Sequence, residues 1–168
     1  MKTCKEQHGI ELPELDLGGG YAIAYVAGDV TVEPEDVLPA LSAVVKRECA
    51  AAGLALPVIS IEPGRNIVGP TTFTLYEVGT VKDVVLEDGG IRRYISVDGG
   101  MSDNIRPSLY GSEYSAVLAD RASSLPHALS RVVGKHCETG DIVIRDIQLP
   151  SDIAPGDLLA TPATGAYG

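Results

Sequence analysis

The chain has 168 residues, of which 45% are hydrophobic, and its formal net charge is −10. This length and hydrophobic content are sufficient for one or two folding units with a buried core. The acidic balance argues against binding to nucleic acid or to an anionic membrane, because both need a basic surface. No apolar run approaches the roughly 20 residues of a membrane-spanning helix, and the first residues lack the apolar core of a signal peptide.

Three cysteines, Cys4, Cys49 and Cys137, are widely and irregularly spaced. An odd number in this arrangement is typical of neither a disulfide framework nor a zinc site. We therefore expect a cytoplasmic protein in a reducing environment, with no metal.

The first part of the chain predicts alternating strands and helices. A short extended run at residues 13–17 ends in Gly18-Gly19-Gly20, and apolar residues then recur at spacings of three and four over residues 34–52, as in a helix with one buried stripe. Pro39 either starts this helix or kinks it. A second apolar strand at residues 56–61 ends in Glu62-Pro63-Gly64-Arg65. Such alternation is typical of parallel β/α units, whose ligand sites lie at the carboxyl ends of the strands.

After about residue 72 the pattern changes to strands separated by turns, which predicts a second, antiparallel unit. Residues 87–90 read as a hairpin turn. Because two β/α units cannot close a barrel and the chain stops in a loop, we expect both ends to be truncated. The expected strands cover residues 73–86, 92–97, 115–119, 130–135, 141–148 and 158–161.

Four segments carry candidate functional groups, and each has a plainer alternative. Gly18-Gly19-Gly20 is either a tight turn or a loop that presents backbone N–H groups to a phosphate. Glu62 and Arg65 form either a surface ion pair or a site in which the carboxylate meets a heterocyclic nitrogen and the guanidinium meets an anion.

The other two segments lie in the second part of the chain. If residues 98–111 end in a helical turn, Arg106 and Tyr110 share a face and can grip a carboxylate; otherwise the segment is a capped turn with an inward tyrosine. Cys137, beside Glu138, is either a proton donor or an ordinary thiol in a hairpin loop.

Five segments, taken in order, resemble diaminopimelate decarboxylases over nearly the whole chain. They are Leu15-Asp16-Leu17-Gly18-Gly19-Gly20, Glu62-Pro63-Gly64-Arg65, Asp98-Gly99-Gly100-Met101-Ser102-Asp103-Asn104-Ile105-Arg106, Gly134-Lys135-His136-Cys137-Glu138-Thr139-Gly140-Asp141 and Thr164-Gly165-Ala166-Tyr167.

The resemblance implies an α/β fold plus a β fold. Residues 1–72 would be the C-terminal part of a pyridoxal-phosphate-binding (β/α)8 barrel, and residues 73–168 an incomplete, antiparallel β-sandwich-like domain. It also implies decarboxylation of meso-2,6-diaminopimelate to L-lysine and CO2, a step of lysine biosynthesis, by a homodimer whose active sites are shared between subunits.

The resemblance further implies a role for each candidate residue. Cys137 would be catalytic, as the proton donor to the carbon that loses CO2, and it would serve the neighbouring subunit together with Glu138. Cofactor-binding residues would be Gly18, Gly19, Gly20, Glu62, Gly64, Arg65 and Tyr167, and substrate-binding residues would be Arg65, Arg106, Tyr110 and Glu138.

The chain departs from the family in one respect, because none of its five lysines matches the lysine that binds the cofactor covalently. We therefore expect the chain alone to be inactive. Two alternatives remain: an arginine- or ornithine-type decarboxylase, which Glu138 disfavours, and a non-catalytic regulatory module of the same fold, which the missing lysine favours.

Overall fold

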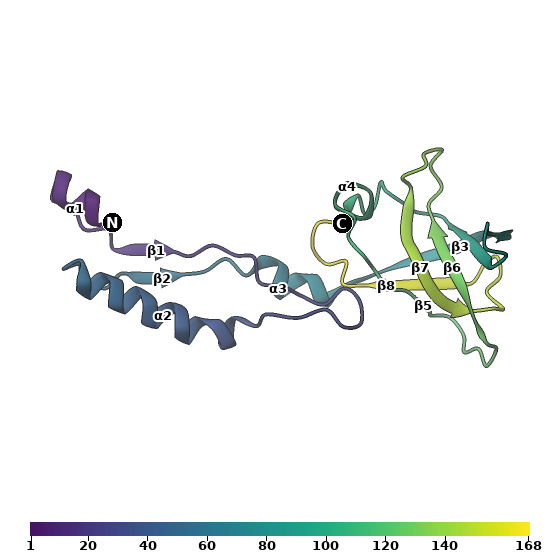
Figure 1. Cartoon of the computed structure of the whole chain (residues 1–168), viewed down its shortest axis with the longest axis horizontal. Helices are drawn as coiled ribbons and strands as arrows, with labels where there is room; N and C mark the ends of the chain where they lie inside the picture. Colours follow the sequence, from purple (N-terminus) through teal and green to yellow (C-terminus); the bar gives the residue numbers. More distant parts are fainter. The chain divides into compact units, whose positions relative to one another are not determined.

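The computed structural model describes all residues from Met1 to Gly168 and divides them into two compact units (Figure 1). The first unit comprises Met1–Ile23 and Val30–Ile67, and the second comprises Ala24–Asp29 and Val68–Gly168. The assignment of residues 1–72 and 73–168 to two domains of a larger enzyme stays a prediction.

The first unit is built on one strand-helix-strand repeat. Strand β1 (Glu14–Asp16) pairs in parallel with β2 (Val58–Ser60), so that Leu15 lies opposite Ile59. Helix α2 (Pro34–Ala51) connects the two strands and buries Val45 and Cys49, which lie one turn apart. Both expected strands and the expected helix are therefore confirmed.

Local sequence explains where α2 begins and ends. Pro34 occupies the first turn, where its missing N–H has no partner to lose, and Glu35 and Asp36 favour the positive end of the helix dipole. Pro39 lies inside the helix, which continues past it to Ala51. Gly53, with a φ of 62°, takes the left-handed conformation that ends many helices.

Three short helices were not expected from the sequence. They are α1 (Lys2–His8), α3 (Gly64–Val68) and the 3-10 helix η1 (Gly69–Thr71). α1 and α3 bury no residue, so their sequences lack the periodic apolar stripe that predicts a helix. No helix of the chain is both long enough and apolar enough to cross a membrane.

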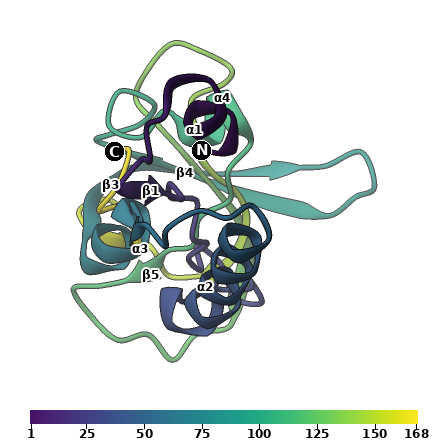
Figure 2. The same ribbon diagram turned by 90° about the vertical axis from the view of Figure 1, so that its left-hand side faces the viewer.

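The second unit is one curled six-stranded sheet with the order β5-β8-β3-β4-β6-β7. In Figure 2, the hairpin of β3 and β4 extends beyond the rest of this sheet. Each expected strand has a counterpart in the structure. The observed strands are β3 (Phe73–Val85), β4 (Ile91–Val97), β5 (Val117–Leu118), β6 (His127–Val133), β7 (Ile142–Pro150) and β8 (Leu158–Pro162).

The expectation of a wholly antiparallel sheet is wrong at one pair of strands. β4 and β6 are parallel neighbours, with Tyr94 opposite Arg131. Parallel neighbours need a crossover connection, and residues 98–126 supply it, with α4 (Arg106–Tyr110) and β5 inside the crossover. The sheet is therefore mixed.

The core of the second unit lies against one face of the sheet. Ile95 of β4 and Leu159 of β8 are fully buried, and alternate residues of β3 point inward with them. The buried cluster comprises Tyr76, Val78, Ile95, Val97, Tyr114, Ala116, Val132, Val143, Ile144, Leu149, Ile153 and Leu159.

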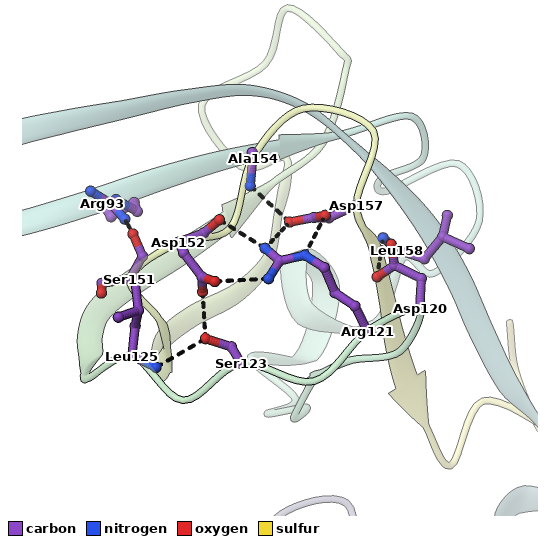
Figure 3. A network of polar contacts seen from close by, with 10 residues as sticks. All are labelled: Arg93, Asp120, Arg121, Ser123, Leu125, Ser151, Asp152, Ala154, Asp157 and Leu158. Carbon is purple, nitrogen blue, oxygen red and sulfur yellow. Dashed lines mark hydrogen bonds and ion pairs between the residues drawn. The ribbon is translucent and has the colours of Figure 1, made fainter.

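A polar network joins the segment before β6 to the connection between β7 and β8 (Figure 3). The Arg121 guanidinium donates to both carboxylate oxygens of Asp157, at 2.9 and 2.7 Å, and to a carboxylate oxygen of Asp152 at 2.8 Å. Ser123 Oγ donates to the other Asp152 oxygen at 2.7 Å. Hydrogen bonds from Arg121 lower the pKa of Asp157, and those from Ser123 and Arg121 lower the pKa of Asp152.

We expect Arg121→Gln to lower the melting temperature of the chain by several degrees at neutral pH, because two partly buried carboxylates lose their cation. Thermal unfolding followed by circular dichroism measures the change. The matched control is Arg47→Gln, since Arg47 pairs only with the adjacent Glu48 on the exposed surface of α2. Such surface pairs contribute little, so the control should melt like the unchanged chain.

The effect of Arg121→Gln should also depend on pH. The two aspartates have lower pKa values in the folded chain than in the unfolded chain. Their contribution is therefore complete above about pH 4, the unfolded pKa of aspartate, and it is lost as the pH falls through the folded values. A difference in melting temperature that is as large at about pH 3 as at pH 7 would contradict this assignment.

Candidate functional site

The loops that follow β1 and β2 run side by side at the carboxyl ends of the two parallel strands. The Leu17 N–H donates to the Ser60 carbonyl oxygen at 2.9 Å, and the Glu62 N–H donates to the Gly18 carbonyl oxygen at 2.9 Å. Parallel pairing therefore brings the glycine loop and Glu62 together.

The glycine loop has a shape that side chains would disturb. Gly18 and Gly20 have φ values of 72° and 95°, which favour glycine. A Cβ atom on Gly19 would overlap with the Glu62 carbonyl oxygen. The N–H groups of Gly19 and Gly20 donate to no group in the chain, and both residues are exposed. The loop thus offers two free donors to an anion.

Arg65 holds the end of this loop through its backbone. From α3, its guanidinium donates to the Gly20 carbonyl oxygen at 3.4 Å and to the Tyr21 carbonyl oxygen at 3.2 and 3.3 Å. Glu62 and Arg65 form no ion pair, so the surface-pair alternative is wrong. The Glu62 carboxylate is exposed and free to meet a ring nitrogen, and the exposed Gly64 begins α3.

In the second unit, aromatic rings enclose the guanidinium of Arg106. Its Cζ atom lies 5.1 Å from the ring centroid of Tyr25 and 5.3 Å from that of Tyr167. Both distances are within the range of cation–π attraction. Arg106 starts α4, and its Nη2 also donates to Ser112 Oγ at 3.3 Å.

Two buried polar atoms beside this stack have no partner in the chain. They are Arg106 Nε and the Tyr25 hydroxyl. Buried polar groups normally find partners, so these two atoms are exceptions within the chain. Tyr25 also packs edge-on against Tyr114, at 5.1 Å between ring centroids. Burial raises the pKa of Tyr114, although hydrogen bonds with Asn104 and Arg106 act in the opposite direction.

Sequence reasoning did not find Tyr25 or Tyr114. The chain has seven tyrosines, one phenylalanine and no tryptophan, and three of the tyrosines gather around Arg106. Nothing in the local sequence of Tyr25 or Tyr114 indicates Arg106 as a partner.

Three predicted site residues are not brought to Arg106 by the structure. Tyr110 lies at the end of α4 with 72% of its surface exposed. Cys137 and Glu138 lie in the loop between β6 and β7, where both are exposed. No side-chain hydrogen bond or stacking contact joins these three residues to Arg106 or Tyr167.

Comparison with protein families assigns the chain to a class. Residues 50–165 match the model described as the pyridoxal-dependent decarboxylase C-terminal sheet domain. Residues 1–69 match the model described as the pyridoxal-dependent decarboxylase pyridoxal-binding domain. The chain belongs to the pyridoxal-dependent decarboxylases, a family whose cofactor is pyridoxal phosphate.

Individual relatives are similar over nearly all of the chain. A diaminopimelate decarboxylase of Corynebacterium efficiens is 53% identical over 162 residues, which are 96% of this chain and 35% of that protein. A diaminopimelate decarboxylase of Mycobacterium tuberculosis is 52% identical over 94% of the chain and also matches over 35% of its own length. The chain therefore spans about a third of these relatives.

A solved structure confirms the fold shared with this family. The diaminopimelate decarboxylase of M. jannaschii, in co-complex with L-lysine, superposes with a TM-score of 0.84 at 26% identity. The match covers 99% of this chain and 36% of that one.

We expect Gly19→Ala to weaken the binding of pyridoxal phosphate, because the added methyl group overlaps with the Glu62 carbonyl oxygen and separates the two loops. The test uses a completed protein in which this chain follows the N-terminal part of the C. efficiens relative. The absorbance of bound cofactor during dialysis measures its retention. The exposed Ala24→Ser should retain the cofactor like the unchanged protein, and equal retention by Gly19→Ala would contradict the role of the loop.

Proposed function

We propose that this chain is part of a pyridoxal-phosphate-dependent enzyme that decarboxylates meso-2,6-diaminopimelate to L-lysine and CO2. The observation that carries the proposal is the pair of loops at the ends of β1 and β2. These loops place two free N–H donors beside a free carboxylate, Glu62. The strand-helix-strand unit would be part of a barrel that is closed by further β/α units, in a cytoplasmic protein.

The free groups of the first unit fit the chemistry of the cofactor. The N–H groups of Gly19 and Gly20 would hold its phosphate, and Glu62 would keep its pyridine nitrogen protonated. Arg65, fixed on the Gly20 and Tyr21 carbonyl oxygens, would keep the loop in this shape. Bound pyridoxal phosphate supplies an electron sink for the negative charge left on the substrate carbon when CO2 departs.

Groups of the second unit would recognise the substrate. Arg106 is oriented by the rings of Tyr25 and Tyr167, and its planar guanidinium would donate to a substrate carboxylate. Tyr110, exposed one turn further along α4, would add its hydroxyl group. The names of the relatives support diaminopimelate as the substrate.

Cys137 and Glu138 would act in the site of a partner subunit. Both are exposed on a loop, and neither contacts Arg106 or Tyr167 of its own chain. Cys137 Sγ would deliver a proton to the carbon that has lost CO2, and Glu138 would bind the distal ammonium group of the substrate. This arrangement requires a homodimer.

A substrate panel separates the alternatives. An arginine- or ornithine-type enzyme would turn over those amino acids in preference to diaminopimelate, and a regulatory module would turn over none. The joint presence of Glu62, Arg65, Arg106, Cys137 and Glu138 favours the catalytic function.

We expect Glu62→Gln in the completed protein to lower kcat by roughly two orders of magnitude, as the loss of one electrostatic stabiliser does in other enzymes. Cofactor retention should change much less, because the amide still accepts a hydrogen bond. Steady-state release of CO2 gives kcat, and Glu87→Gln, in the exposed turn after β3, is the control. Near-normal turnover of Glu62→Gln would show that Glu62 has another role.

Mixing two inactive variants tests the shared site. Glu62→Ala disables the site of its own subunit, and Cys137→Ala disables the site of the partner. A heterodimer of the two contains one site with both defects and one intact site. Free exchange of subunits should therefore restore about one quarter of the unmodified activity. Verified heterodimers that stay inactive would exclude the shared arrangement.

A further inference from the structure

Asp141 is a buried carboxylate that the proposed function does not use. It lies at the end of the loop between β6 and β7, and only 2% of its side chain is exposed. Its Oδ1 accepts the Met101 N–H at 2.7 Å, and its Oδ2 accepts the His136 N–H at 2.7 Å. The ring Nδ1 of His136 also lies 2.7 Å from Oδ2. One side chain therefore binds two separate loops.

Both loops have a glycine where the carboxylate lies. A Cβ atom on Gly100 or on Gly134 would overlap with the Asp141 carboxylate. The Lys135 N–H donates to the Gly99 carbonyl oxygen at 3.0 Å, which joins the same two loops directly. The backbone of both loops thus encloses this carboxylate closely.

Asp141 stays ionised in this enclosure. Burial opposes the charge, but the N–H groups of His136 and Met101 and the His136 ring outweigh burial and hold the pKa of Asp141 below its usual value. A carboxylate that accepts several N–H bonds is a strong anchor, because charge-assisted hydrogen bonds are stronger than neutral ones.

Cys137 and Glu138 lie along the chain between His136, which Asp141 binds, and Asp141 itself. His136, directly before Cys137, is bound by Asp141 through its backbone and its ring. The Glu138 N–H donates to the His136 carbonyl oxygen at 2.9 Å, and the Asp141 N–H donates to the Glu138 carbonyl oxygen at 3.1 Å. The exposed thiol and carboxylate therefore project from a closed turn.

We propose that Asp141 is a positioning residue that holds the turn bearing Cys137 and Glu138 in the geometry with which these side chains serve the partner subunit. The inference rests on the proposed function. Exposed loops are ordinarily mobile, whereas a proton donor must be held within about 0.5 Å of its productive position. The anchor meets this need from inside the donor's own subunit, without touching substrate or cofactor.

Asp141→Asn in the completed protein should lower kcat roughly 10- to 100-fold, in the range that small misplacements cause. The amide has one acceptor oxygen, so one of the N–H groups now bound by Oδ1 or Oδ2 would face an NH2 group. The matched control is Asp88→Asn, because Asp88 is an exposed turn carboxylate that accepts only the Gly90 N–H. Activity is measured per bound cofactor, so that a smaller folded fraction does not count as a lower kcat.

Mixing then locates the defect. A mixture of the Glu62→Ala and Asp141→Asn variants should recover about one quarter of the unmodified activity. In their heterodimer, one site has an intact Glu62 and receives an intact turn from the other subunit. A mixture of the Cys137→Ala and Asp141→Asn variants should recover no activity, because both turns of their heterodimer are defective. If Asp141 instead supported Arg106 of its own subunit through the Met101 loop, the two mixtures would behave in the opposite way.

Each other outcome also decides the inference. The opposite pattern, or unchanged kcat in Asp141→Asn, would overturn it while leaving the proposed function intact. Failure of the mixture of Glu62→Ala with Cys137→Ala would instead overturn the shared site, and the inference with it. Should Asp141→Asn not fold, His136→Ala takes its place, since it removes only the ring contact, and it should show the same mixing pattern with a smaller loss of kcat.

Discussion

Close approach of neighbouring groups to the backbone at glycine is the constraint on which the candidate site depends. Gly19 lies against Glu62, Gly99 lies against the ring of Tyr76, and Gly100 and Gly134 lie against Asp141. A Cβ atom at any of these positions would overlap with its neighbour. Only glycine lets the backbone of these loops lie so close to a neighbouring carbonyl oxygen, ring or carboxylate.

Three arginines of this acidic chain each have specific partners within the chain. Arg65 binds carbonyl oxygens, Arg106 is enclosed by tyrosine rings, and Arg121 binds two carboxylates. In each case the planar guanidinium satisfies several partners at once, which an ammonium group does less well. A net charge of −10 therefore coexists with arginines that have well-defined partners within the chain.

Much of the secondary structure could be predicted because its signals are local. Alternation and turn residues locate the strands of the second unit, and a helical stripe with an early proline locates α2. The parallel pairing of β4 and β6 escaped prediction. It depends on the path of the crossover between these strands, and no periodicity in either strand records that path.

The residues of the candidate site also differ in whether local sequence or only the tertiary structure identifies them. The sequence by itself determined the glycine loop, Glu62, Arg65, Arg106, Cys137 and Glu138 as candidates, because their motifs are contiguous and their backbone requirements are local. Only the tertiary structure decided that Tyr25 and Tyr167 enclose Arg106, and that the Asp141 carboxylate binds both its own loop and the loop of Met101. These contacts join residues that are far apart along the chain, and folding of the sheet and its crossover is what brings them together.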